Sequence, residues 1–237
     1  VGQNGSGKTT LVKHFNGLLK PTEGKVLVGD WDTQEVAVSK LASRVGYVFQ
    51  NPDEQLFTKN VGEEIVFGPR NLGYDDEKIA ALLEKSLTLA ELAKEKDTNP
   101  YDLSPTWRKM VALASIVAMD TSIVILDEPT TGQDAANIAR IANMVDVLRE
   151  EGKTVIAITH DIDFAAENFT RMIALSQGKM LLDGPTQEVL AEEEMLATTY
   201  VDPPQLTRLA KKLNLPQAVR NETEFLAAYK AKTQQAS

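Results

Sequence analysis

The hydrophobic and polar positions of the chain follow two different periods. Short apolar runs rich in β-branched residues predict strands, whereas apolar residues that recur every three or four positions predict helices. The predicted strands cover residues 24–30, 45–49, 123–126 and 154–159, and residues 171–184 predict a further pair of strands. Because strand and helix signals alternate along most of the chain, the fold is predicted to be α/β.

The middle of the chain departs from this alternation. Between about residues 61 and 103, the helical stretches "VGEEIVFG" and "DDEKIAALLEKSLTLAELAKE" follow one another with no strand between them. Another helix is predicted over about 104–119, so residues 61–119 are expected to form a helical subdomain inserted into the sheet. Two short helices are predicted past Pro203. The predicted division is therefore a main domain over 1–202 and a C-terminal helical appendage over 203–237.

The first ten residues, "VGQNGSGKTT", fit the spacing G-x-x-x-x-G-K-[ST] of a phosphate-binding loop. Glycines permit backbone angles that turn successive N–H groups toward phosphate oxygens, and the helix that follows adds its positive end. Lys8 is expected to bind the outer phosphates, and Thr9 to offer its hydroxyl to Mg²⁺. A plain glycine-rich turn is the alternative interpretation. The predicted nucleotide-binding residues are Asn4, Gly5, Ser6, Gly7, Lys8, Thr9 and Thr10.

The stretch after this loop is predicted to be an amphipathic helix. Its apolar residues recur at helical spacing, at Leu11, Val12, Phe15, Leu18 and Leu19. His14 lies on the same helix, where a structural role is expected for it.

Two acidic residues follow the predicted strand "IVIL". Four consecutive apolar residues suit a strand that is buried on both faces, and Asp127 at its end is expected to hold the water shell of a metal ion. Glu128 comes next, where the strand opens into a loop. A carboxylate beside a terminal phosphate can orient or deprotonate a water for in-line attack. The alternative, that the pair is a solvated turn, is common for adjacent acids.

Two further polar residues come directly after predicted strands. His160 follows "TVIAIT", at the carboxyl end where α/β sheets build their sites, and it is predicted to be catalytic. Gln50 follows "VGYVF", and its neutral amide is predicted to contact Mg²⁺ or the attacking water.

Composition limits the remaining classes of function. The 237 residues are 43% hydrophobic, which suffices for a full core. The net charge of −9 argues against nucleic acid as the main partner. No apolar run approaches the roughly eighteen residues of a membrane helix. The sequence has no cysteine, which excludes disulfides and thiolate metal sites.

The order of these residues resembles an ABC-type ATPase from Val1 to about Leu209. The resemblance depends on the phosphate-binding loop followed by Gln50, Asp127, Glu128 and His160. Within that family, "FQNPDEQLF" and "FGPRNLG" are similar to the ATP-binding subunits of energy-coupling factor importers, which take up vitamins, cobalt and nickel. The resemblance implies a P-loop NTPase sheet with an inserted helical subdomain.

The same resemblance implies cofactors and partners. ATP and Mg²⁺ would lie between the phosphate loop of one subunit and the signature segment of a second ATPase subunit, in a head-to-tail dimer. A transmembrane scaffold subunit would dock near Gln50, and a small membrane subunit would bind the transported substrate. The chain would then work at the cytoplasmic face of the cell membrane.

Members of this family carry several strands before the phosphate loop, whereas only Val1 precedes it here. The chain is therefore expected to be truncated at its N-terminus and to lack those strands. Without those strands, part of the sheet would lack its neighbours, and an exposed sheet edge invites aggregation. The chain of 237 residues is therefore expected to bind ATP weakly or not at all.

A second departure from the family lies at residues 103–107. The family has Leu-Ser-Gly-Gly-Gln there, and this chain has "LSPTW". Ser104 is retained as a predicted nucleotide-binding residue of the signature segment. It can still cap the following helix, and proline is well tolerated at a first helical position. Pro105 has no N–H to donate to a phosphate, however, and the next two residues are bulky. A heterodimer with one competent and one weakened site is therefore predicted.

Three alternatives to an importer ATPase follow from these patterns. The "LSPTW" segment also fits a regulatory subunit that binds nucleotide without hydrolysing it, and Glu128 argues against that alternative. ABC proteins of DNA repair or translation have coiled-coil insertions or basic linkers, and neither is seen in this sequence. A nucleoside kinase would share the phosphate loop but would not require Asp127, Glu128 and His160.

Overall fold

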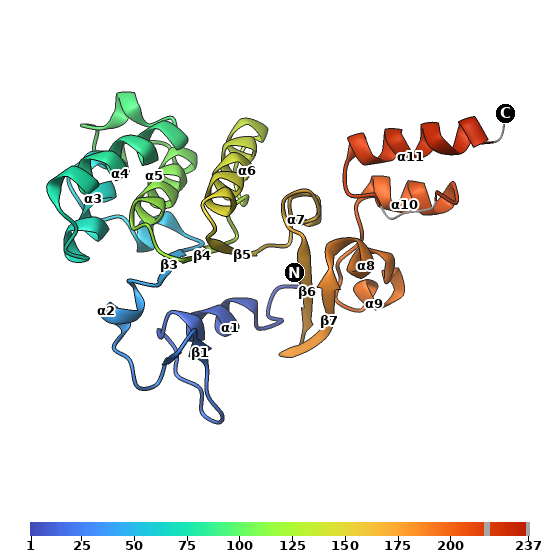
Figure 1. The fold of residues 1–237 in the computed structure, drawn as a ribbon, viewed down its shortest axis with the longest axis horizontal. Helices are drawn as coiled ribbons and strands as arrows, with labels where there is room; N and C mark the ends of the chain where they lie inside the picture. The colour runs from blue at the N-terminus through green and yellow to red at the C-terminus, as the bar shows by residue number, and fades with distance from the viewer. Residues whose placement is uncertain (216–218, 236–237) are drawn as a thin grey trace. The chain divides into compact units, whose positions relative to one another are not determined.

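Two groups of residues pack separately in the computed structural model, which describes residues 1–215 and 219–235. One unit consists of Thr9–Ile158, and the other combines Val1–Lys8 with Thr159–Ser237. Each unit has its own hydrophobic core. Figure 1 labels the helices and strands of both. The predicted boundary between residues 202 and 203 stays a prediction.

A parallel sheet of three strands lies in the unit Thr9–Ile158. The strands pair in the order β3, β4, β5, and they are β3 (Val45–Val48), β4 (Ile123–Asp127) and β5 (Thr154–Ile158). Their register brings the carboxyl ends of β3 and β4 together, with Val48 opposite Leu126. These strands occupy the apolar runs that predicted them, which confirms that part of the prediction. Residues that directly follow β3 and β4 therefore meet at one edge of the sheet.

Helix α5 (Pro105–Ala118) packs against β3. Gly46 on that strand shows how close the two elements are. A Cβ atom at Gly46 would lie 2.6 Å from Ile116 Cγ2 and 2.9 Å from Thr121 Oγ1. Thr121 Oγ1 also accepts a hydrogen bond from the Gly46 N–H (3.1 Å). Only glycine lets the helix and the strand approach at this point.

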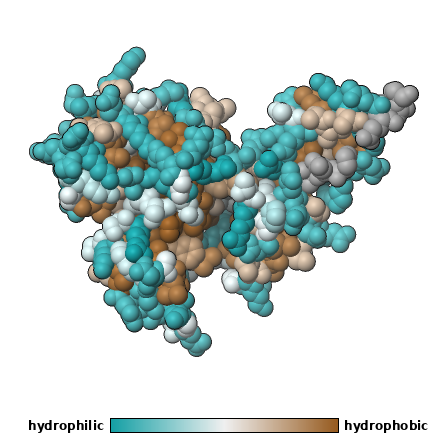
Figure 2. Space-filling view, viewed as in Figure 1, coloured by the Kyte–Doolittle hydropathy of each residue, from teal (hydrophilic) through white to brown (hydrophobic). Residues whose placement is uncertain are grey.

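The predicted helical segment contains no strand, as expected. It is formed by α3 (Val61–Asn71), α4 (Asp76–Leu89) and α5, joined by 3₁₀ turns at Ala93–Glu95 and Pro100–Asp102. A polar side chain caps the N-terminus of each helix, at Asn60, Asp75 and Ser104. In Figure 2, the visible face of these helices is mostly hydrophilic, with some hydrophobic residues between.

Shorter elements complete this unit. Helix α6 (Ala135–Glu150) connects β4 to β5 and is capped by Asp134, whose side chain accepts a hydrogen bond from the Asn137 N–H (2.8 Å). The others are α1 (Lys8–Phe15), β1 (Leu27–Val28), β2 (Trp31–Asp32), α2 (Val38–Leu41) and the 3₁₀ turn Pro52–Glu54.

The helix predicted after the phosphate loop is shorter than expected. α1 ends at Phe15, so the inclusion of Leu18 and Leu19 was wrong, and both side chains are exposed. Gly17 adopts a φ of +75°, and the Asn16 side chain accepts a hydrogen bond from the Leu18 N–H. A glycine in this conformation ends a helix, which overrides the apolar spacing.

The other unit is built around an antiparallel pair of strands. β6 (Arg171–Ser176) and β7 (Lys179–Pro185) pair with each other, as predicted. Val1 lies beside β6, because its amino group donates to Ile173 O (2.7 Å) and its carbonyl accepts from the Leu175 N–H (3.0 Å). The helices of this unit are α7 (Ile162–Asn168), α8 (Thr186–Ala191), α9 (Glu193–Ala197), α10 (Gln205–Lys212) and α11 (Glu222–Gln235).

Among the described residues, none of the helices combines the length and the apolar character that a membrane crossing requires.

Candidate active site

The phosphate-binding loop depends on its glycines for two different reasons. Gly2, Gly5 and Gly7 all have positive φ angles, of +144°, +79° and +97°. A Cβ atom at Gly2 would lie 2.2 Å from Leu175 O, so space also requires glycine there. Gly5 faces open space, and its backbone angle alone favours glycine. The loop therefore has the curved backbone that a phosphate group needs.

Two polar side chains of this loop fit an anionic ligand. Ser6 is 1% exposed, and among the described residues its hydroxyl has no hydrogen-bond partner. Lys8 is also buried, and its ammonium group donates to Gly2 O (2.7 Å) and Gln3 O (2.9 Å). A buried hydroxyl without a partner is costly unless a ligand completes it. Together with the helix that begins at Lys8, these groups fit a phosphate.

The remaining predicted residues of the loop are exposed or partly exposed. Asn4, Gly5 and Thr10 lie at the surface. His14 Nδ1–H donates to Thr10 O (2.7 Å), within the first helix. This contact agrees with the structural role predicted for His14.

Asp127 is the centre of the predicted metal site, and both of its carboxylate oxygens are held. Its side chain is buried, at 2% exposure. The Thr9 hydroxyl donates to Oδ1 (3.3 Å), and the Tyr47 hydroxyl donates to Oδ2 (2.7 Å). The structure thus brings together two of the residues predicted for Mg²⁺. Carboxylate and hydroxyl oxygens are ligands that Mg²⁺ accepts.

Tyr47 was not among the predicted residues. It lies on β3 opposite Ile125 of β4, in a strand whose other side chains are apolar. Burial and the hydrogen bond to Asp127 raise the pKa of the Tyr47 phenol far above its usual value, so the hydroxyl remains a donor. The only signal in the sequence was one side chain with a hydroxyl group in an otherwise apolar strand.

Glu128 is held in an uncommon backbone conformation. Its φ is +47°, and its N–H donates to Ile158 O (2.8 Å), next to the end of β5. The residue is 5% exposed. A non-glycine residue in this region costs on the order of 1–3 kcal/mol, and such strain persists where surrounding contacts impose it. The chain thus turns out of the sheet at the residue predicted to be the general base.

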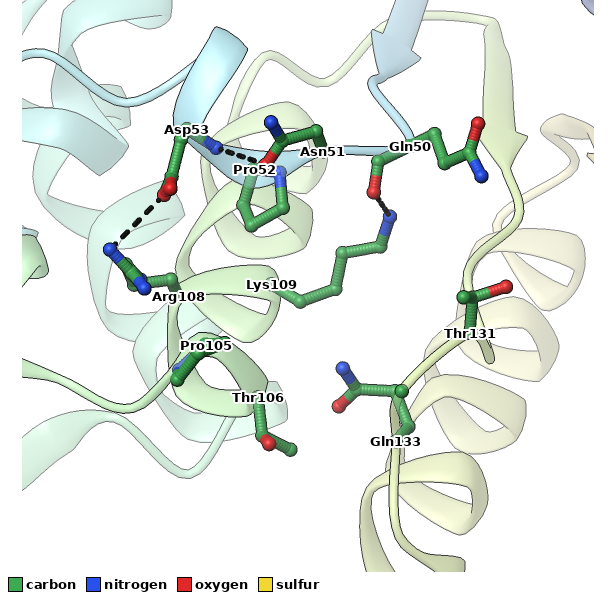
Figure 3. Close-up of a pocket in the computed structure, with 11 residues that line it drawn as sticks. Gln50, Asn51, Pro52, Asp53, Pro105, Thr106, Arg108, Lys109, Thr131 and Gln133 are labelled. Carbon is green, nitrogen blue, oxygen red and sulfur yellow. Dashed lines mark hydrogen bonds and ion pairs between the residues drawn. The ribbon is translucent and has the colours of Figure 1, made fainter.

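Lys109 joins the ends of β3 and β4, and it was not predicted. Its ammonium group donates to the main-chain oxygens of Phe49 (2.9 Å), Gln50 (2.7 Å) and Asp127 (3.4 Å). Burial lowers the pKa of Lys109 to about 8, although Asp127 and Glu128 oppose that change. In Figure 3, the Gln50 carbonyl faces Lys109, while the Gln50 amide points the other way.

Ser104 caps α5, as predicted. Its side-chain oxygen accepts from the Trp107 N–H (3.4 Å), and Pro105 is the first helical residue. A pocket of about 130 Å³ lies beside this turn. It is lined by residues 50–53, by the first turn of α5 with Lys109, and by residues 131–133.

His160 lies in the turn between β5 and α7. The backbone of this turn is held by Thr159, whose hydroxyl accepts from the Asp161 N–H (2.9 Å), and Asp161 caps α7. His160 is exposed and belongs, like Lys8, to the unit that contains the phosphate loop. Thr9, Gln50, Asp127 and Glu128 belong to the other unit. The catalytic role of His160 stays a prediction.

Known proteins are similar to this chain over most of its length. The family model described as ABC transporter matches residues 1–131. An ABC transporter ATP-binding protein of Pyrococcus furiosus is 40% identical, and the match covers 95% of this chain and 86% of the relative. The energy-coupling factor transporter ATP-binding protein EcfA of Methanoculleus marisnigri is 40% identical over 90% of this chain and 77% of the relative. An ABC transporter ATP-binding protein of Methanosarcina acetivorans is 44% identical over 89% of this chain, which spans only 34% of that relative.

Solved structures lead to the same family. The cbiO1 protein of Clostridium perfringens, part of the ABC transporter complex cbiONQ, has a TM-score of 0.73 and 32% identity. The match covers 90% of this chain and 85% of that protein. An ATP-binding cassette solved as a dimer in a post-hydrolysis state with ADP and Pi has a TM-score of 0.70 and 28% identity, over 78% of this chain and 83% of the cassette. The fold is thus that of an ABC ATPase, and the chain belongs to the ABC transporter family of ATP-binding proteins.

Proposed function

We propose that this chain is the ATP-hydrolysing subunit of an energy-coupling factor importer and powers the uptake of a vitamin or a metal ion. The observation that carries the proposal is the group of contacts at the end of β4. Asp127 is held by Thr9 and Tyr47, and Glu128 follows in a fixed, strained conformation. A subunit that only binds nucleotide needs no carboxylate at this second position.

Each residue of this group has a separate proposed role. When bound, ATP with Mg²⁺ supplies the terminal phosphoryl group and the charge that polarises it. Thr9 and Asp127 would hold the metal, with Gln50 as a further ligand through its side-chain amide. A Glu128 carboxylate oxygen would take the proton of the attacking water. Within the unit that contains the phosphate loop, Ser6 and Lys8 would bind phosphate oxygens, and His160 is proposed to be catalytic.

Replacing Glu128 tests the proposal. In the full-length protein, Glu128→Gln should leave ATP affinity within a few-fold of wild type and reduce the hydrolysis rate by about 100-fold or more. Glu150→Gln, at the exposed end of α6, is the matched control and should hydrolyse ATP normally. Equal rates in both variants would contradict the role of Glu128.

The second candidate function is that of a non-hydrolysing regulatory partner. Pro105 at the first position of α5 supports it, because that residue has no N–H to donate. The alternative is favoured if wild-type protein binds ATP but releases no phosphate. If this alternative holds, Glu128→Gln should have no measurable effect on turnover.

The same segment supports a heterodimer with one weakened site. This chain would complete its partner's site poorly, while its own phosphate loop and Glu128 would serve the other site. Pro105→Gly, Thr106→Gly and Trp107→Gln, made together, should raise the turnover of the assembled dimer. A homodimer of the wild-type chain with two fully active sites would contradict this proposal.

A membrane partner is proposed to dock beside the segment that follows Gln50. Phe57 and Phe67 are exposed there, at 62% and 45%, and their rings pack edge to face with centroids 4.7 Å apart. Exposed aromatic pairs favour contact with another protein. This would place the chain at the cytoplasmic face of the membrane, together with a scaffold subunit and a substrate-binding subunit. Replacing both rings by serine should weaken copurification with the scaffold and leave ATP binding unchanged.

A further inference from the structure

Lys109 is a buried cation whose three donors are all used. The residue is 2% exposed. Its ammonium group donates to three main-chain carbonyls, two from the segment after β3 and one from the end of β4. Lysine is almost never fully buried unless it has such partners. Packing of helix α5 alone therefore does not explain why Lys109 is buried.

These carbonyls lie where the sheet ends. The ladder between β3 and β4 stops at the pair Val48 and Leu126, so the carbonyls of Phe49 and Gln50 lie past its last rung. These carbonyls are only partly shielded from solvent, and among the described residues they have no strand partner to donate to them. Lys109 donates to them instead, and it comes from a helix rather than from a neighbouring strand. It thus continues the link between β3 and β4 beyond the sheet.

The charge of Lys109 also matches its surroundings. Asp127 and Glu128 are both buried, and both favour the charged form of the lysine. A single buried cation accordingly lies among two carboxylates and three carbonyl dipoles. Removing it would leave the segments after β3 and β4 joined by fewer contacts, next to a pocket of about 130 Å³ that Gln50 and Lys109 both line (Figure 3).

We infer that Lys109 is a positioning residue for hydrolysis, because it sets where Gln50 and Asp127 stand relative to helix α5. This inference rests on the proposed function. The hydrogen bonds of Lys109 to these residues go to their main-chain oxygens, so we expect it to act through them and not on the nucleotide. Misplacement of a reacting group by about 1 Å can cost about 100-fold in rate.

The test compares Lys109→Met with Lys153→Met in the full-length protein. Lys153 is a good control because its side chain is also largely buried, at 9% exposure, and bonds to Asp120 and to Thr121 O. It precedes β5, at the opposite end of the sheet from Gln50. Lys109→Arg keeps the charge and the donors, and the neighbouring pocket offers room for the larger group.

Two measurements are needed. Steady-state hydrolysis should show kcat lowered by about 10- to 100-fold in Lys109→Met, with KM for ATP within about three-fold of wild type. Mn²⁺ titration by electron paramagnetic resonance, with a non-hydrolysable ATP analogue, should show several-fold weaker metal binding in the same variant. Lys109→Arg should recover part of both, and Lys153→Met should change neither.

The outcomes separate this inference from the proposed function. If wild-type protein hydrolyses ATP and both lysine variants behave alike, Lys109 has no positioning role. If wild-type protein does not hydrolyse ATP, the proposed function fails, and the Mn²⁺ titration still decides whether Lys109 positions Asp127. A Lys109→Met variant that melts at the same temperature as Lys153→Met excludes general unfolding as the cause of lost activity.

Discussion

Replacing Tyr47 by phenylalanine removes one hydroxyl and should destabilise the protein well beyond the size of that change. The hydroxyl donates to Asp127 Oδ2 at 2.7 Å, and Asp127 is 2% exposed. Water therefore has little access to replace the lost donor. Thr9 contacts the other carboxylate oxygen, at the longer distance of 3.3 Å, and cannot compensate. A hydrogen bond to a charged group contributes about 1.5–3 kcal/mol, and we expect a loss of that size in Tyr47→Phe.

Urea unfolding of the nucleotide-free protein measures this loss. A double-mutant cycle with Asp127→Asn then assigns it to the pair, because a neutral amide oxygen accepts a weaker hydrogen bond. Tyr47→Phe should cost only about 0.5–1.5 kcal/mol in the Asp127→Asn background. Two results would refute the reasoning: a loss below about 0.5 kcal/mol in Tyr47→Phe, or the same loss in both backgrounds.

Three further predictions concern stability. Burial tends to raise the pKa of Asp120, but hydrogen bonds from two lysines outweigh it and hold the pKa below 3.8. The ion pairs of Asp120 therefore stabilise the fold above its ordinary pKa, and this stabilisation is lost as the pH falls through the lowered pKa. Asp120→Asn should cost about 1 kcal/mol of stability at pH 7 and progressively less in acid. Urea unfolding at several pH values measures this loss. Gly46→Ala places a methyl group against Ile116 and should cost about 1–3 kcal/mol, part of which Ile116→Ala restores in thermal unfolding. Asp134→Ala removes the cap of α6 and should cost about 1 kcal/mol, whereas Asp134→Asn should cost much less by the same measurement.

Strands β3, β4 and β5 could be predicted because their signals are local, whereas the strand predicted over residues 24–30 is only the two-residue β1. An apolar run of β-branched residues predicts β4 without any tertiary information, and the acids that follow it must lie at the strand end. The same logic failed at Leu18, because the left-handed turn at Gly17 ends the helix before the apolar pattern does.

Tyr47 and Lys109 could not be predicted because their roles depend on distant partners. Tyr47 reaches Asp127 across 80 positions of the chain, and Lys109 reaches Gln50 across 59. No periodic pattern encodes such contacts, and an isolated polar residue in an apolar segment has many explanations. The positive φ of Glu128 is likewise invisible in the sequence, since its N–H bonds to Ile158 O, at the end of another strand.

The position of Lys109 on α5 supports an unequal pair of sites. The helix begins at Pro105 and is capped by Ser104, and Lys109 is its fifth residue, about one turn further along. Substitutions at residues 105–107 change the end of the helix that would face a partner subunit, but they leave the cap and the ammonium contacts intact. The hydrogen bonds of Thr9 and Tyr47 to Asp127, and of the Glu128 N–H to Ile158 O, are made outside residues 105–107. A chain of this kind can therefore lose the phosphate-contacting groups of its signature segment and still keep its own carboxylates in position, which is the physical condition that a heterodimer with one strong and one weak site requires.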